Sequence, residues 1–376
     1  MPIPFLPNEL VDQILSYFQP LSRFHYYTAL VCRNWLEPSR KYLYHKVEFS
    51  IVKDETSTEY MHPLELKLTR YSRRSWQLLS TVGNDSGLAE LVKEVSFKQL
   101  SSESEFECSP VFTTTQALIS TAMRLPPYAT SFRFENDEWF DLQHSGAFFP
   151  HMERLQALTF ESLYDEDCWG PLSRLPNLRS LELGYTFSCS SGSQPLPPFV
   201  SRLQVLCLAT CSEALFDALC NGSKTSLRKL KIPLNLGLKL ARSQWHNLTH
   251  LSVSDSCSNL PSSDQVSGFV HAVSSSCPIL IELSLSAIAL NFIRGRSGSS
   301  FSLPASCSRV NFEEIPSFET ALSFVLRENY HPGIRELGLY DDPNRSYSDQ
   351  TVVLTFFGLR ALMEATGGEL IWYSEK

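Results

Sequence analysis

Residue types that could carry chemistry occur in this 376-residue chain as short local clusters. The acidic stretch ENDEWFD at 135–141 could hold paired carboxylates for acid–base work. The stretch RGRSGSS at 294–300 has two glycines but lacks the lysine of a phosphate-binding loop. Cys207 and Cys211 form one lone pair, whereas a structural zinc site needs two pairs at short spacing. We therefore expect a solvated edge, a surface loop and reduced, mostly buried thiols at these places.

The remaining reactive residue types do not assemble into a catalytic set. The nine histidines are scattered without ligand spacing, and neither G-x-S-x-G nor H-E-x-x-H occurs. The sequence therefore predicts a protein that is not an enzyme, with no catalytic residue, no metal and no cofactor.

Net charge and hydropathy limit the classes of partner and the cellular compartment that we expect for this protein. The net charge of −8 argues against non-specific attraction to nucleic acid or to an anionic membrane, because phosphates require a basic surface. The N-terminal residues have no cationic start, and no stretch approaches the ~18 apolar residues of a membrane span. We expect an intracellular protein, cytoplasmic and/or nuclear.

A repeat determines where most of the polar residues stand. The pattern apolar-x-x-apolar-x-apolar recurs about every 25 residues. The last two apolar positions alternate, as in a strand with one buried face, and one such unit cannot bury that face without stacked neighbours. Clear copies lie at 155–160, 178–183, 203–208, 227–232, 248–253, 280–285 and 334–339, with weaker ones at 92–97, 129–134 and 307–312.

These copies resemble the leucine-rich repeat family in its irregular, helix-containing form, over roughly residues 90–340. The resemblance implies an α/β fold in which a right-handed solenoid lines its concave face with parallel strands. Residues flanking the buried pair of each strand would point into that face, where solenoids commonly bind protein partners. The candidate substrate-binding residues are Arg133, Glu135, Lys229, Lys231, His250, Arg309, Asn311, Glu336 and Tyr340. The alternative is a solvated inner surface with no ligand at any given residue.

Segments between the repeats predict further elements. Apolar spacing predicts helices at 214–222, with Gly222 after the end, and at 263–277, 317–329 and 351–368. The stretch ELIWY at 369–373 is typical of a closing strand, and HKVEFS at 45–50 of a first strand.

The N-terminal segment LPNELVDQILSYF at 6–18 predicts a helix capped by Asn8, with Glu9 in its first turn and a wide apolar stripe. RFHYYTALVCRNW at 23–35 has helical spacing, and Pro38 is expected to start a third short helix. Three short helices bury too little apolar surface to stand alone, so they need the solenoid or a partner.

LPNELVDQILSYF, LVCRNW and LYHKVEF together resemble an F-box, particularly the kind found in many fungal proteins. F-box proteins are substrate receptors of Skp–cullin–F-box ubiquitin ligases. The resemblance implies a three-helix domain at 1–45 that docks on a Skp-family adaptor and through it a cullin, with a solenoid at 46–376 that binds an unknown protein substrate. The implied adaptor-binding residues are Leu6, Pro7, Ile14, Leu15, Val31 and Trp35, the last as packing support. The alternative is a protein-binding repeat scaffold without a ligase role, whose N-terminal helices only cap the solenoid.

Overall fold

A computed structural model of the chain shows an α/β protein with a solenoid-like arrangement of parallel strands and few helices. It describes residues 6–18, 23–30, 33–52, 75, 77–100, 129–135, 153–163, 169–186, 198–236, 239–240, 242–254, 269, 273, 275–286, 303–312, 334–341, 357, 359–361, 363–364 and 367–374. The chain separates into two compact units, Met1–Leu178 and Arg179–Lys376. The boundary predicted after residue 45 lies within the first unit.

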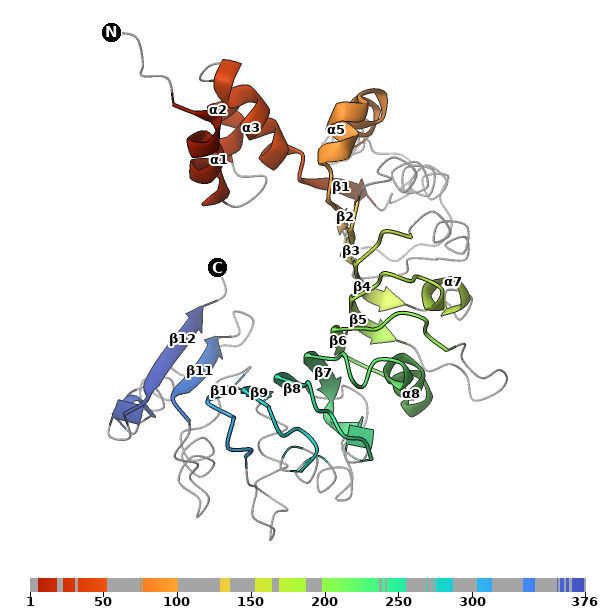
Figure 1. The fold of residues 1–376 in the computed structure, drawn as a ribbon, viewed down its shortest axis with the longest axis vertical. Helices are drawn as coiled ribbons and strands as arrows, with labels where there is room; N and C mark the ends of the chain where they lie inside the picture. Colours follow the sequence, from red (N-terminus) through yellow and green to blue (C-terminus); the bar gives the residue numbers. More distant parts are fainter. Residues whose placement is uncertain are drawn as a thin grey trace, which may run out of the picture. The chain divides into compact units, whose positions relative to one another are not determined.

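The N-terminal segment forms the helices α1 (Asn8–Ser16), α2 (Arg23–Ala29) and α3 (Arg33–Leu43) (Figure 1). The prediction that Asn8 caps the first helix is wrong. Pro7 occupies the cap position, no side chain bonds the first turn, and the Pro7 carbonyl accepts from the amides of Leu10 and Val11 at 3.1 and 3.2 Å. The helix therefore begins without a side-chain cap.

The prediction that Pro38 starts a helix is also wrong, because Pro38 lies inside α3. A proline there removes one backbone hydrogen bond of the helix. Beyond Pro38, two contacts hold the second half of α3 against its neighbours: the Ser39 hydroxyl bonds the Thr28 hydroxyl of α2 at 3.0 Å, and Lys41 pairs with Asp12 of α1 at 3.0 Å.

Every predicted strand is present. The described residues contain twelve strands, which follow one another in sequence order and pair in parallel. In each of the ten repeat copies the strand begins at the third residue of the pattern. The strands of the first unit are β1 (Lys46–Val52), β2 (Glu94–Leu100), β3 (Ser131–Glu135) and β4 (Ala157–Leu163). Those of the second are β5 (Ser180–Thr186), β6 (Val205–Leu208), β7 (Lys229–Pro233), β8 (His250–Ser254), β9 (Glu282–Leu285), β10 (Arg309–Phe312), β11 (Glu336–Asp341) and β12 (Glu369–Ser374).

The register places equivalent repeat positions side by side. In the second unit Leu230 pairs with Leu251, and Leu251 with Leu283, so the apolar positions of neighbouring repeats form one continuous buried row. Backbone bonds mark each strand entry: the Thr249 carbonyl accepts from the amides of Ile281 and Glu282 at 2.8 and 3.0 Å. In successive repeats, one carbonyl oxygen accepts hydrogen bonds from two amides of the next repeat in the same way. These bonds keep neighbouring strands in register.

Helices are short and few among the described residues. They include α5 (Ser86–Leu91), α7 (Trp169–Ser173), α8 (Glu213–Asn221) and the 3₁₀ turn η4 (Leu234–Leu236). Helix α8 confirms the prediction at 214–222, with the Ser212 hydroxyl capping its first turn. The helix predicted at 317–329 lies outside the described residues, and those at 263–277 and 351–368 are described only in part. None of the helices in the described part is long and apolar enough to cross a membrane.

Candidate protein-binding surfaces

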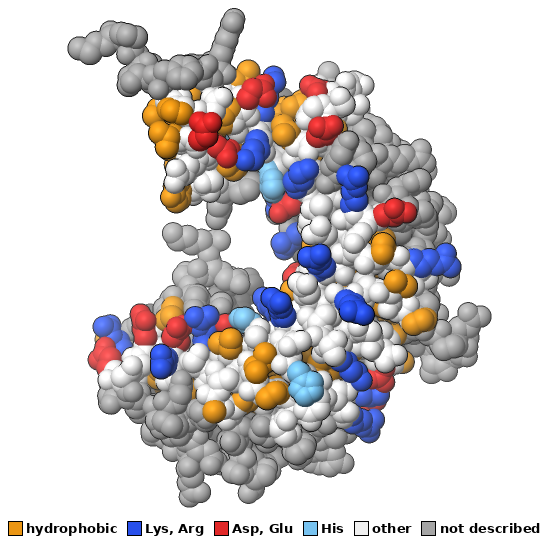
Figure 2. Space-filling view, viewed as in Figure 1, with side chains coloured by type: hydrophobic (Ala, Val, Ile, Leu, Met, Phe, Trp, Pro, Cys, Tyr) orange, Lys and Arg blue, Asp and Glu red, His pale blue; other side chains and the backbone are white. Residues whose placement is uncertain are grey.

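Helix α1 has an apolar side that faces solvent. Leu6, Leu10, Ile14 and Phe18 recur every fourth residue, and their side chains are 37%, 46%, 37% and 38% exposed. Residues four apart lie on one side of a helix, so these four, which begin just before α1 and end just after it, form one row. We call this row the apolar stripe. Hydrophobic side chains gather over the N-terminal helices in Figure 2.

The other side of α1 is buried against the neighbouring helices. Val11 and Leu15 are 0% exposed. Lys41 of α3 contacts both carboxylate oxygens of Asp12 at 3.0 Å, and the Tyr42 hydroxyl donates to the Asp12 carbonyl at 3.1 Å. The hydrogen bond that Lys41 donates to Asp12 raises the pKa of Lys41 above its usual value, against the opposing effect of burial. Helix α1 is thus held from its inner side while the apolar stripe stays outside.

The predicted adaptor-binding residues divide between these two sides. Leu6, Pro7 and Ile14 are exposed, Trp35 is half-buried in α3, and Val31 lies outside the described residues. Leu15 is fully buried, so its side chain holds the helices together and is not on the surface. Sequence reasoning did not include Leu10 and Phe18 among the contacts, although the four-residue spacing that links them to Leu6 and Ile14 was visible.

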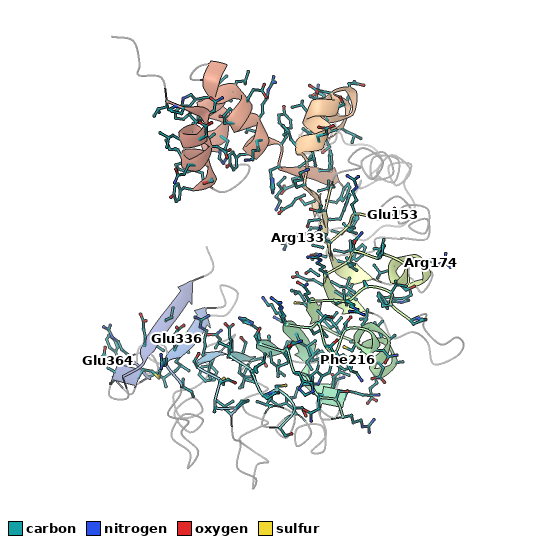
Figure 3. All side chains as sticks on the ribbon, viewed as in Figure 1. Arg133, Glu153, Arg174, Phe216, Glu336 and Glu364 are labelled. Atoms are coloured by element: carbon teal, nitrogen blue, oxygen red, sulfur yellow. The ribbon has the colours of Figure 1, made fainter. Side chains whose placement is uncertain are left out.

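The second surface is the outward face of the strands, which we define as the third and fifth positions of each repeat. Arg133 and Lys229 are exposed there, and Lys231 is half-buried. Glu135 and Tyr340 belong to β3 and β11, but their side chains lie outside the described part. Figure 3 labels Arg133 in the first unit and Glu336 in the second. The candidate residues are thus divided between the two units.

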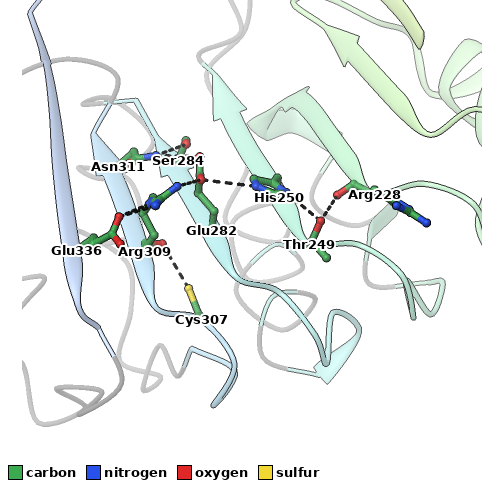
Figure 4. A network of polar contacts seen from close by, with 9 residues as sticks. All are labelled: Arg228, Thr249, His250, Glu282, Ser284, Cys307, Arg309, Asn311 and Glu336. Atoms are coloured by element: carbon green, nitrogen blue, oxygen red, sulfur yellow. Dashed lines mark hydrogen bonds and ion pairs between the residues drawn. The ribbon is translucent and has the colours of Figure 1, made fainter. Parts of the chain in front are cut away.

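Within the second unit, charged residues from three neighbouring strands meet (Figure 4). Glu282, Arg309 and Glu336 are register partners on β9, β10 and β11. Arg309 Nη1 donates to Glu282 Oε2 at 3.1 Å, and Arg309 Nε donates to Glu336 Oε2 at 2.6 Å. The hydrogen bonds that Arg309 donates to Glu336, and after it to Glu282, raise the pKa of Arg309. The three residues are far apart in the chain, and the parallel register alone brings them together.

Asn311 extends this network one position further along β10. Its Nδ2 donates to Glu282 Oε1 at 2.9 Å and approaches Ser284 Oγ at 3.5 Å. The residue is 1% exposed, and its Oδ1 accepts no hydrogen bond from the described residues. A buried acceptor without a donor is uncommon in folded proteins.

His250 borders the network from β8. The Thr249 hydroxyl donates to the Arg228 carbonyl at 3.0 Å and lies 2.8 Å from His250 Nδ1. Because a hydroxyl has only one proton, Nδ1 carries the hydrogen in this second contact. His250 Nε2 then faces Glu282 Oε2 at 3.7 Å, which becomes an ion pair when the imidazole is protonated.

These arrangements place apolar and charged side chains on exposed parts of the described structure. The described residues include no group of three His, Cys, Asp or Glu side chains that could hold a metal. The five described cysteines, which are Cys207, Cys211, Cys220, Cys277 and Cys307, form no disulfide, and four of them are buried. Burial raises the pKa of the Cys277 thiol to about 12 and that of Cys307 to about 11, so both stay protonated at neutral pH.

Comparison with known proteins adds no relative to these observations. No protein-family model matches the chain, and no curated protein matches it significantly.

Proposed function

We propose that this chain is the substrate-recognition subunit of a Skp–cullin–F-box ubiquitin ligase. The N-terminal helices would dock on a Skp-family adaptor, which links them to a cullin, and the outward face of the solenoid would hold a protein substrate. The chain itself would be non-catalytic, with ubiquitin transfer performed by other subunits.

One observation carries the proposal: α1 has an apolar side whose residues are more than a third exposed, with Phe18 at its end packed edge-on against His25 of α2. A helix that only capped the solenoid would need a polar outer side, because terminal repeats face water. The apolar stripe instead has the spacing of a helix that lies in a partner's groove. Leu6, Pro7 and Ile14, which the F-box resemblance assigns to the adaptor, lie on the exposed side.

Co-purification of the full chain with a Skp-family adaptor tests the proposal. Ile14→Asp places a charge on the apolar stripe and is expected to weaken adaptor binding at least ~tenfold while the fold persists. Leu15→Asp places a charge in the helical core and is expected to unfold these helices. Val200→Asp is the matched control, because Val200 is 67% exposed and belongs to the second unit. A wild-type chain that fails to bind the adaptor would refute the ligase role.

The second candidate is a repeat scaffold without a ligase role, and one observation favours it. The His45 carbonyl, just after α3, accepts from the amides of Lys93 and Glu94 at 2.9 Å, so the helical segment connects directly to the hydrogen bonds of the first strands. Deleting residues 1–45 separates the candidates. A chain whose helices only cap the array should aggregate, whereas a chain that has lost a docking module should stay soluble and no longer bind the adaptor.

A further inference from the structure

The core of the second unit is partly open at β12. Leu370 occupies the fourth position of the repeat pattern on this strand and is the register partner of Leu337 on β11. Leu337 is 0% exposed, whereas Leu370 is only half-buried. The equivalent residue of every other strand, from Val47 of β1 to Val310 of β10, is at most 3% exposed. Because neighbouring repeats cover each other's inner residues, Leu370 indicates a neighbour that the described part of the chain does not supply.

The backbone of β12 has an open edge at the same place. The amide of Glu369 donates to the Arg335 carbonyl at 2.8 Å, so the backbone groups of Glu369 face β11. Successive residues of a strand turn these groups to alternate edges, so those of Leu370, Trp372 and Ser374 face away from β11. Among the described strands, β12 is the last of the sheet and pairs with β11 alone (Figure 1). This edge therefore presents a row of donors and acceptors to an added strand.

The sequence of β12 lacks the usual protection of a sheet edge. Edge strands are commonly shielded by lysine, by proline or by being very short. The stretch ELIWYS has six residues, no lysine, no proline and one charge, at Glu369. The opposite end of the sheet differs, because Val47 and Phe49 of β1 are each only 3% exposed. The inner positions are thus closed at β1 and open at β12.

We infer that two copies of this chain associate through β12, with the two strands antiparallel. A two-fold interface requires a surface that is its own complement. Pairing centred on Ile371 places Ile371 opposite itself and Leu370 opposite Trp372 of the second copy. The backbone groups of Leu370 and Trp372 both face this edge, so they exchange hydrogen bonds as antiparallel partners do. Glu369 falls opposite Tyr373, so no like charges meet.

The open inner position favours a second copy as the occupant. A head-to-tail contact would add β12 to β1, whose inner residues Val47 and Phe49 are already covered. Two β12 edges share the same deficit, so each supplies the strand that the other lacks and covers the other's Leu370. Strand β12 belongs to the second unit, so this inference does not rest on the ligase role.

Sedimentation velocity of the full chain over about 1–100 µM tests the inference. The wild type is expected to convert from monomer to dimer as its concentration rises. Leu370→Pro removes an amide from the open edge, and an edge strand tolerates proline where the amide points away from the sheet. It should weaken dimerisation at least ~tenfold. Leu370→Val keeps the amide and is the matched control, with a change of less than about threefold. Circular dichroism checks that both variants fold.

Charges at Ile371 locate the two-fold axis. This residue holds an outward position, so a charge there stays out of the core. Ile371→Lys and Ile371→Glu each place like charges opposite each other and should weaken self-association about fivefold. Mixing the two variants should restore dimers, because lysine then faces glutamate across the axis. Val200→Lys changes an exposed residue outside β12 and should leave dimerisation unchanged.

A wild-type chain that stays monomeric over this range overturns the inference, even if another extended segment binds the β12 edge. Dimers that persist unchanged in Ile371→Lys and Ile371→Glu also overturn it, and this result decides the matter if Leu370→Pro fails to fold. Species that keep growing with concentration would show a head-to-tail contact and overturn the two-fold arrangement. These variants keep the apolar stripe, so a chain that dimerises but binds no Skp-family adaptor upholds the inference and refutes the ligase role.

Discussion

The two units bury the same repeat position with different side chains. In β1–β4 the inner residue is phenylalanine each time: Phe49, Phe97, Phe134 and Phe160 stack with ring centroids 5.6, 5.0 and 4.8 Å apart. In the second unit the same position is mostly aliphatic, occupied by Leu183, Leu208, Ile232, Val253, Leu285, Phe312 and Leu339. Both sets are buried, and both belong to parallel strands in equivalent register.

This difference shows that the repeat specifies where a side chain is buried but not how the core is filled. An aromatic row adds ring stacking to area burial, about 0.5–1.5 kcal/mol for each pair. The aliphatic row depends on close packing alone. The second unit also has a fully buried Trp245, whose ring centroid lies 6.2 Å from that of Phe216. In a solenoid each repeat is stabilised by its neighbours, so the two units should respond differently to matched core substitutions.

The largest expected effect is at the centre of the aromatic row. Phe134 stacks on both Phe97 and Phe160, so Phe134→Ala should lower the free energy of unfolding by about 4 kcal/mol. Leu208→Ala in the second unit removes less area and no stacking, and should cost about 3 kcal/mol. Urea denaturation followed by circular dichroism measures both.

Phe134→Leu is the control for stacking, because it keeps most of the apolar volume. It should cost about 2 kcal/mol, since two ring contacts are lost. If Phe134→Leu is neutral, the stacked geometry adds nothing and the two units are equivalent.

A smaller effect is expected where the second unit uses an aromatic residue of its own. Trp245 Nε1 donates to the buried Leu240 carbonyl at 3.0 Å. Trp245→Phe leaves that carbonyl without its donor and opens a small cavity, so the free energy of unfolding should fall by about 2 kcal/mol. The loss of tryptophan fluorescence makes circular dichroism the suitable probe, and an unchanged urea midpoint would contradict the prediction.

The smallest effect concerns pH and is specific to the second unit, which contains all five described cysteines. Burial raises the pKa of Cys277 from 9.0 to about 12, so the folded state favours the protonated thiol. That stabilisation is complete below pH 9 and is lost as the pH rises toward 12. Between pH 8 and 10 the thiol should account for a loss of about 1 kcal/mol in unfolding free energy.

Comparing wild type with Cys277→Ala at pH 8 and pH 10 isolates this thiol, because the variant should lack its share of the pH dependence.

The rate at which iodoacetamide alkylates Cys277 compares the local stability of the two units. Phe134→Ala acts in the first unit and should leave the protection of Cys277 unchanged, whereas Leu208→Ala should increase its labelling. Equal labelling in both variants would show that the units open together.

Much of this fold was visible in the sequence, and the exceptions have physical causes. Ten repeat copies placed ten strands, because alternation with a fixed period leaves a strand only one way to bury its apolar side. Pro38 was misplaced because local propensity favours proline at a helix start, whereas α3 begins five residues earlier, at Arg33, and its second half is held by the contacts of Ser39 and Lys41 with the neighbouring helices. Asn8 was misplaced as a cap because Pro7 already occupies that position.

For the candidate surfaces, the sequence by itself determined which residues belong to the apolar side of α1 and which point outward from the strands. Only the tertiary structure decided that Leu15 is buried and Ile14 exposed, since the packing of α1 against α3 selects one part of a wide stripe. It also decided that Arg309 lies between Glu282 and Glu336 and that Glu369 stands beside Glu336. Periodicity determines the direction of each side chain, but parallel register alone determines its neighbours.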